Sequence, residues 1–175
     1  MLVSRIGQAA GQTWGGLAVR RVHAEAKIAQ LGMNLPAVSP PKGSYVLAQW
    51  ADQKTLYLAG HLPKTPAGDL VTGKVGKDVT VEQAKLAAES AGLSLLATLK
   101  ATLGDLDKVE QVIKVVGFVN CVDGFADQPQ VINGCSDLLF KVFGDKGKHA
   151  RSAVGTNALP LGVCVEIEMV VRVKA

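Results

Sequence analysis

The sequence predicts an α+β fold in which two helices cover one face of a largely antiparallel, six-stranded sheet. Residues 163–173 alternate strictly, with apolar side chains at every odd position and Glu166 and Glu168 among the even ones, as in a strand with one buried face. Two segments with helical spacing, 80–104 and 129–144, flank a stretch rich in Val and Ile. The 175 residues are enough for one domain with a substantial core.

The first third of the domain is expected to contain mostly short elements. A short helix is predicted over 23–31, where apolar side chains share one side and a glycine follows. A proline-rich stretch then forces an extended path. Segments 45–50 and 55–59 are predicted to form a hairpin, and the glycine-rich stretch 60–77 is expected to hold one further short strand.

The first long helix is predicted from its ends. Thr80 and Gln83 form a capping box, and Gly104 follows the last turn. One face of this helix carries small and apolar residues suited to close packing on a sheet: Ala84, Ala88, Ala91, Leu95 and Leu99. A strand over 109–122 follows.

The second long helix is expected to begin near Pro129 and to end at Gly144. Its apolar face comprises Ile132, Cys135, Leu139 and Val142. Segments 152–157 and 163–173 are then predicted to pair as a final hairpin. The helices leave the other face of the sheet without a cover, which self-association would supply.

Charge and composition argue against several classes of protein. The net charge is +4, but the three arginines before residue 23 have no acidic neighbours, and the remaining residues carry a net charge of +1. This balance, with an aromatic content of 5%, does not favour nucleic-acid binding. No uninterrupted apolar run approaches the roughly 20 residues that cross a bilayer.

Residues 1–22 are predicted to be an N-terminal extension to a domain spanning 23–175. The extension contains arginines and no acids, like a mitochondrial transit peptide, although its glycines weaken an amphipathic helix. A disordered tail and an upstream start are the alternatives. The expected location is therefore cytoplasmic or mitochondrial.

Metal and nucleophile chemistry find little support. Cys121, Cys135 and Cys164 are widely spaced among apolar residues, which is typical of reduced, buried thiols. There is no CxxC motif, and the three histidines lie far apart, so neither a metal nor a cofactor is expected. The two GxxG strings are interpreted as ordinary turns, and no phosphate-binding glycine loop or GxSxG elbow occurs.

Arg151 and Glu166 are the best candidates for chemistry. An arginine can bind a carboxylate through its planar fork, and a glutamate can transfer protons, so together they suggest a small-molecule site. The alternative is an exposed strand with solvated charges.

These two residues lie in segments that resemble the RidA/YjgF family, also called the L-PSP endoribonuclease-like group. The matching segments are SYV at 44–46, LYLAGHLP at 56–63, the helical stretch at 78–109, VINGCSDLLFKVFG at 131–144, and R-x-x-V with LP and VEIE at 151–168. The resemblance covers about residues 24–175, and the spacing of fifteen between the arginine and the glutamate agrees with the family.

The resemblance implies a chorismate-mutase-like fold and a homotrimer whose sheets pack into a central barrel, with sites in the clefts between subunits. It also implies hydrolysis of reactive 2-imino acids to 2-keto acids and ammonia, a metabolite-repair reaction that needs no cofactor. By position, Arg151 would bind the substrate carboxylate, and Glu166 would activate water and move protons.

Four further residues receive a role from the resemblance. Tyr45 would contact the substrate, and Asn133 would line the cleft from a neighbouring subunit. Gly60 would bring its backbone close to the substrate, and Val154 would add a backbone contact near the arginine.

The sequence also departs from the RidA-type pattern. Ala153 stands where those members have cysteine, and Ala59 and His61 replace the serine and glutamine that flank the glycine. About four extra residues precede Asn133. These departures indicate a divergent subgroup, so a non-catalytic trimer that binds small carboxylates is an alternative function. An endoribonuclease or translation inhibitor is a second alternative, disfavoured by the near-neutral charge and few aromatics.

Overall fold

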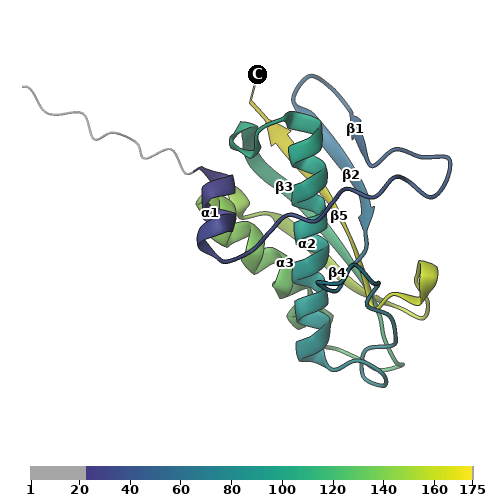
Figure 1. The fold of residues 1–175 in the computed structure, drawn as a ribbon. Helices are drawn as coiled ribbons and strands as arrows, with labels where there is room; N and C mark the ends of the chain where they lie inside the picture. Colours follow the sequence, from purple (N-terminus) through teal and green to yellow (C-terminus); the bar gives the residue numbers. More distant parts are fainter. Residues whose placement is uncertain (1–22, 175) are drawn as a thin grey trace, which may run out of the picture.

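The computed structural model describes residues 23–174, which form one mixed sheet of five strands with helices on one face (Figure 1). The strands are β1 (Ala48–Trp50), β2 (Thr55–His61), β3 (Val109–Asn120), β4 (Ala150–Thr156) and β5 (Val165–Val173). The α-helices are α1 (Ala24–Gln30), α2 (Val81–Leu103) and α3 (Gln128–Phe143), and the 3₁₀ turns are η1 (Leu106–Lys108), η2 (Gly144–Gly147) and η3 (Pro160–Gly162). The predicted extension at 1–22 lies outside the described residues.

The predicted final hairpin is wrong. The strand order is β1-β2-β5-β3-β4, so β5 lies between β2 and β3, while β4 is an edge strand parallel to β3. The helix α3 explains this arrangement, because a crossover helix returns the chain to the end of the sheet where β3 began.

The predicted count of six strands is also wrong for the described residues. Beyond the end of β2 at His61, the rest of stretch 60–77 forms only isolated bridges, including Lys64 with Leu70 and Thr72 with Val163. Glycines at positive φ interrupt this stretch, for example Gly73 at φ 116°, and prevent a continuous strand. The first strand is also shorter than predicted.

The prediction for α2 is confirmed in detail. The Thr80 hydroxyl accepts a hydrogen bond from the Gln83 backbone N–H, and the Gln83 side-chain oxygen accepts one from the Thr80 backbone N–H. Gly104 adopts the left-handed conformation at φ 77°. The predicted small and apolar face of the helix is fully buried. Within residues 23–174, no helix combines the length and hydropathy that a membrane span requires.

The helix-covered face of the sheet forms the core. The odd-numbered side chains of β5 from Val165 to Val173 all point into it, as predicted. The helices α2 and α3 cross closely above them, because Gly134 leaves room for the backbone carbonyl of Lys85. A Cβ at position 134 would collide with that carbonyl oxygen.

The opposite, helix-free face has no cover among the described residues. Tyr57 of β2 is 53% exposed and Val154 of β4 is 44% exposed. Val116, Phe118 and Val170 lie between them and are half-buried. These apolar side chains share the face with Glu166 and Glu168 of β5, and their joint exposure is unusual for a face left to solvent.

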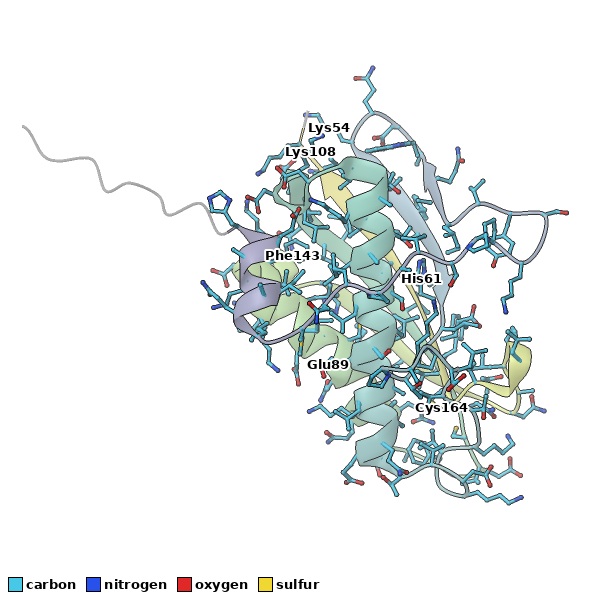
Figure 2. The ribbon with its side chains drawn as sticks, viewed as in Figure 1. Lys54, His61, Glu89, Lys108, Phe143 and Cys164 are labelled. Carbon is cyan, nitrogen blue, oxygen red and sulfur yellow. The ribbon has the colours of Figure 1, made fainter. Side chains whose placement is uncertain are left out.

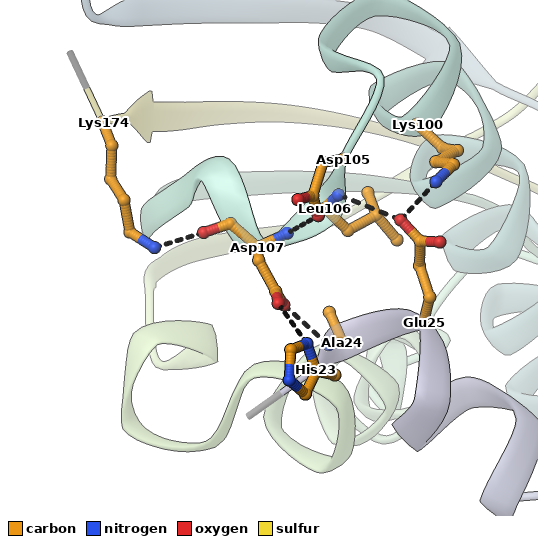
Figure 3. Close-up of polar contacts among 8 residues, drawn as sticks. All are labelled: His23, Ala24, Glu25, Lys100, Asp105, Leu106, Asp107 and Lys174. Carbon is orange, nitrogen blue, oxygen red and sulfur yellow. Dashed lines mark hydrogen bonds and ion pairs between the residues drawn. The ribbon is translucent and has the colours of Figure 1, made fainter. Parts of the chain in front are cut away.

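Helix α1 is fastened to the turn η1 by paired polar groups (Figure 3). The Nδ1 atom of His23 lies 2.9 Å from Asp107, which also accepts a hydrogen bond from the Ala24 backbone. Glu25 forms an ion pair with Lys100 at 2.5 Å and accepts a bond from the Leu106 backbone. These contacts fix the point at which the chain enters the domain.

Candidate functional site

Arg151 lies on β4 and points toward α3. Its partner in the parallel pairing with β3 is Val115, whose side chain is buried under the helices. The Nη1 atom of Arg151 donates to Asn133 Oδ1 at 2.8 Å and to Ser136 Oγ at 3.0 Å. Both hydrogens of Nη1 are therefore used.

The other edge of this guanidinium remains available. Arg151 is half-buried, and Nε and Nη2 have no acceptor among the residues that the structure describes. No Asp or Glu of the described chain forms an ion pair with it either. A partly buried cation without an anionic partner is a good receptor for a carboxylate.

Two residues beside Arg151 were not predicted from the sequence. Ser136 Oγ lies 3.0 Å from Nε2 of His149, and Nδ1 of His149 lies 2.6 Å from the Gly147 carbonyl oxygen. The spacing of three residues between Asn133 and Ser136 places both on one face of α3, which is the only sequence signal for the serine.

Glu166 lies on β5 at an even position and therefore points to the helix-free face. It is half-buried, and burial raises its pKa above the ordinary value, with the neighbouring charge of Glu168 adding to the effect. No ion pair with a described residue offsets this rise. A carboxyl with a raised pKa is suited to accepting and returning protons near neutral pH.

Gly60 packs directly against Glu166. A Cβ at position 60 would collide with the Glu166 carboxylate, so glycine is required for this contact. The pairing of β2 with β5 shifts register between Leu58 and His61, which places Gly60 in a β-bulge. Bulges of this kind redirect side chains next to functional sites.

The bulge turns His61 into the space between β2 and α2 (Figure 2). Its Nδ1 atom donates to the Ala59 carbonyl at 2.7 Å, and Nε2 lies 2.7 Å from Thr98 Oγ1. Burial lowers the pKa of His61, and the charge of Lys64 adds to this effect. Both ring nitrogens are thus committed to structural hydrogen bonds.

A cavity of about 240 Å³ opens beside this bulge. Tyr45 and Gly60 line it together with His61, Thr98 of α2 and the segment 37–42. Gly60 therefore separates the cavity from Glu166. The size suits a small metabolite.

A second, more open hollow of about 390 Å³ lies between α1 and η1. Four of its charged groups are those that fasten α1 and pair with one another, and Asp105 accepts a hydrogen bond from the Asp107 backbone (Figure 3). It lies away from Arg151 and Glu166, so it is the weaker candidate.

The structure thus gathers the predicted residues into two groups. Arg151 and Asn133 form one group at β4 and α3, while Tyr45, Gly60 and Glu166 lie around the β2 bulge. The two groups do not meet within one chain: β3 separates β4 from β5, and the arginine and the glutamate point to opposite faces.

Val154 belongs to neither group by its side chain. It lies on the strand of Arg151 but pairs with Phe118 and points to the helix-free face. Ala153 points to the helix side and packs against the core.

Lys74 is another residue that the sequence did not suggest. Its ammonium group donates to Asn120 Oδ1, to the Cys121 carbonyl and to the Asn157 carbonyl at 3.1, 3.2 and 2.5 Å. These contacts anchor the loop after β4, which carries Leu159 and Pro160. Nothing in the local sequence indicates such distant acceptors.

The cysteines are free and buried, as predicted. Burial raises the pKa of Cys135 to about 12 and that of Cys164 to about 11, so neither forms a thiolate readily at neutral pH. No group of three or more potential His, Cys, Asp or Glu metal ligands occurs in the described part of the chain.

Comparison with known proteins supports the fold. Residues 25–171 match the family model described as "YjgF/chorismate_mutase-like, putative endoribonuclease". Protein TCP17 of Trypanosoma cruzi is 40% identical over 84% of this chain and 92% of its own length.

Two solved structures are similar as well. The protein Atu1372 of Agrobacterium tumefaciens, solved with its function unknown, is 41% identical with a TM-score of 0.79, and the match covers 87% of this chain and 93% of that one. A putative endoribonuclease of Shewanella oneidensis MR-1 is 27% identical with a TM-score of 0.82, covering 86% and 99% of the two chains.

Proposed function

The chain belongs to the YjgF/chorismate-mutase-like family, and on this basis we propose that it is an enamine/imine deaminase acting on 2-imino acids. The reaction adds water across the C=N bond and releases ammonia, leaving a 2-keto acid. The family contains both imine deaminases and putative endoribonucleases, so membership alone does not select the activity.

One observation carries the proposal: the half-buried guanidinium of Arg151 has its Nη1 side held by α3 and its Nε and Nη2 edge without a partner in the described chain. This edge can bind both oxygens of a carboxylate. A 2-imino acid carries its carboxylate next to the reacting carbon, so binding at Arg151 would also orient the imine.

Glu166 would supply the proton transfers. Its carboxylate would accept a proton from water as the water oxygen attacks the carbon of the imine, which enters already protonated on nitrogen, and the product is a neutral amino alcohol. Glu166 would then return this proton to the amine nitrogen as the C–N bond breaks, and the hydroxyl proton would pass to solvent, leaving the C=O group and ammonia. The raised pKa of Glu166, caused first by burial, favours both transfers near neutral pH.

We propose that the site forms between subunits of a homotrimer, in which Arg151 and Asn133 of one copy meet Tyr45, Gly60 and Glu166 of the next. The separation of the two groups within one chain supports this arrangement. The uncovered apolar surface around Tyr57 supports it too, because assembly would bury that surface. In such a cleft the Val154 backbone would lie near the substrate.

The test uses a dehydratase that generates a 2-imino acid in the presence of the purified protein. We expect faster release of ammonia, and a fall in kcat/KM of at least about a hundredfold for Arg151→Ala, because a charged hydrogen-bonding pair is lost. Lys85→Ala is the matched control, since Lys85 forms only a surface ion pair with Asp137. Equal activity of Arg151→Ala and the wild type would refute the role of the arginine.

A second candidate is a trimer that binds small carboxylates without turnover. It is favoured by the alanine at position 153, which packs against the core where RidA-type members carry cysteine, and by His61, whose ring nitrogens are both occupied. It predicts that a 2-keto acid raises the melting temperature while ammonia release stays at the uncatalysed rate. Cleavage of RNA by the purified protein, lost in a point variant, would instead support the endoribonuclease alternative.

A further inference from the structure

Ser136 and His149 form a chain of hydrogen bonds that ends on the arginine of the proposed site. Ser136 comes from the middle of α3, and His149 lies just before β4, so two separate segments meet here. Neither residue contacts the free Nε and Nη2 edge of Arg151. Ser136 accepts a hydrogen bond from Nη1 on the opposite side of the guanidinium, and His149 acts through Ser136.

The direction of each bond follows from the acceptor at the end of the chain. The Gly147 carbonyl oxygen can only accept, so Nδ1 of His149 must carry a hydrogen. In the neutral ring Nε2 is then an acceptor, and the Ser136 hydroxyl donates to it across 3.0 Å. With its hydrogen committed, the Ser136 oxygen turns its lone pairs to Nη1 of Arg151.

The surroundings keep the ring of His149 neutral at physiological pH. Burial lowers its pKa, and the positive charge of Arg151 adds to this effect, while the Gly147 carbonyl opposes it. Most other charged groups on neighbouring elements are occupied elsewhere: Asp145 pairs with Lys148, Asp137 with Lys85, Lys141 lies near Glu89, and Lys114 donates to Ser152 on the other face of the sheet. Lys146 of η2 is exposed to solvent.

We propose that Ser136 and His149 are positioning residues for Arg151: they fix the rotation of its guanidinium so that the Nε and Nη2 edge is presented to a carboxylate. This inference rests on the proposed role of Arg151 as the carboxylate receptor. Asn133 supplies a second fixed acceptor for Nη1, so the two bonds define the plane of the guanidinium as well as its direction.

A role for Ser136 as a nucleophile is less consistent with the geometry. Ser136 lies within α3, whose backbone N–H groups are used by the helix and cannot stabilise an oxyanion. His149 is oriented by a neutral carbonyl rather than by a carboxylate. The arrangement therefore suits holding a cation better than attacking a carbonyl.

The first experiment measures binding of 2-oxobutanoate, a stable 2-keto acid, by isothermal titration calorimetry. Ser136→Ala is expected to weaken binding about tenfold, because a hydrogen bond to a charged group is lost. Ser136→Thr, which keeps the hydroxyl, should restore binding to within about threefold. Thr102→Val is the matched control, since it removes a helix hydroxyl that bonds only to the Thr98 carbonyl.

The second pair of variants tests His149. His149→Phe should weaken binding like Ser136→Ala, whereas His149→Gln should rescue it, because the glutamine oxygen can accept the Ser136 hydroxyl. If the deaminase activity is present, the weakened variants should raise KM with little change in kcat, as expected when an interaction is made equally in the ground and transition states. Failure of the conservative variants to rescue binding would overturn the positioning role.

A measurement without ligand separates this inference from the proposed function. The ¹⁵N NMR spectrum of the His149 ring should show a protonated Nδ1 and an unprotonated Nε2, and the Arg151 guanidinium should rotate faster in Ser136→Ala than in the wild type. The opposite tautomer, or unchanged rotation, would refute the hydrogen-bond chain from His149 through Ser136 to Arg151, even if 2-oxobutanoate binds. If this hydrogen-bond chain is observed but the wild type neither binds 2-oxobutanoate nor releases ammonia, the proposed function fails and the hydrogen-bond chain stands.

A proton linkage supplies a further readout. Because the charge of Arg151 helps to hold the pKa of His149 down, a bound carboxylate that neutralises this charge should raise that pKa. We expect saturating 2-oxobutanoate to raise the NMR titration midpoint of His149 in the wild type and not in Arg151→Met. An unchanged midpoint with ligand bound would place the ligand away from Arg151.

Discussion

The two faces of the sheet differ in how far one chain covers them. The helix-covered face is closed by α2 and α3 and buries a continuous apolar layer, whereas the helix-free face leaves Tyr57 and Val154 open to solvent. The candidate chemistry is divided in the same way, with Arg151 on the helix side and Glu166 on the open side. The fold of one chain therefore completes the helix-covered face, and we propose that association of chains completes the site on the helix-free face.

The largest expected effect is on stability, at the crossing of α2 and α3 on the helix-covered face. Gly134→Ala should lower the free energy of unfolding by about 3 kcal/mol, because the new methyl group meets the rigid backbone carbonyl of Lys85. Gly92→Ala is the matched variant on α2, where the methyl would meet side-chain atoms of Leu138 and Cys135 rather than a backbone carbonyl. Urea denaturation should show a clearly smaller loss for Gly92→Ala; equal losses would contradict the close crossing.

On the helix-free face, Tyr57→Asp should dissociate the proposed trimer rather than unfold the chain. We expect sedimentation to report a monomer with an unchanged far-UV circular dichroism spectrum. Activity should fall at least about a hundredfold, because each site would lose half its residues. Leu86→Asp, at an even more exposed apolar position on α2, should leave the mass of the particle unchanged. A wild type that is itself monomeric and active would disprove the division of the site between subunits.

Acidification should lower the free energy of unfolding through His61 and His149. Burial lowers the pKa of His61 and of His149 in the folded protein, while the unfolded chain titrates near the ordinary value of about 6.5. The unfolded state therefore binds more protons below that pH, and stability is full above about 6.5 and lost as the pH falls through the folded pKa values. Calorimetric melting from pH 7 to 5 should show a shallower fall in His61→Gln than in the wild type.

Glu166 should have the opposite and smallest effect. Its pKa is raised in the folded state, so its contribution to stability is present below the unfolded value and lost as the pH rises through the folded one. Glu166→Gln should therefore be slightly more stable than the wild type at pH 7, by less than about 1 kcal/mol because solvent screens a half-exposed group. Reduced stability of Glu166→Gln at pH 7 would contradict the raised pKa assigned to this carboxyl group.

Local signals in the sequence predicted the elements well. The capping box at Thr80 and the alternation in β5 involve neighbours in the chain, and both are confirmed. The pairing of strands depends on distant segments, and here the predicted hairpin failed because α3 returns β4 parallel to β3. The local periodicity of a sequence does not indicate where such a crossover occurs.

The site was predictable only in part for the same reason. The residues themselves suggested Arg151 and Glu166, and the resemblance gave them roles. Their separation follows from strand pairing, because Arg151 pairs with the buried Val115, whereas Glu166 pairs with Phe118 on the helix-free face. The contacts of Ser136 with His149 and of Lys74 with Asn157 join residues 13 and 83 positions apart. Neither pair follows a helix or strand period, so only the folded structure reveals them.

The position of β5 has a consequence for how the protein is made. It is the last strand along the described chain, yet it joins the β1–β2 pair to the β3–β4 pair. On the ribosome, the two halves of the sheet must wait for residues 165–173 to emerge, with their hydrogen-bonding edges exposed until then. Nascent chains stalled before β5 has emerged are therefore expected to be the species that aggregate or require a chaperone.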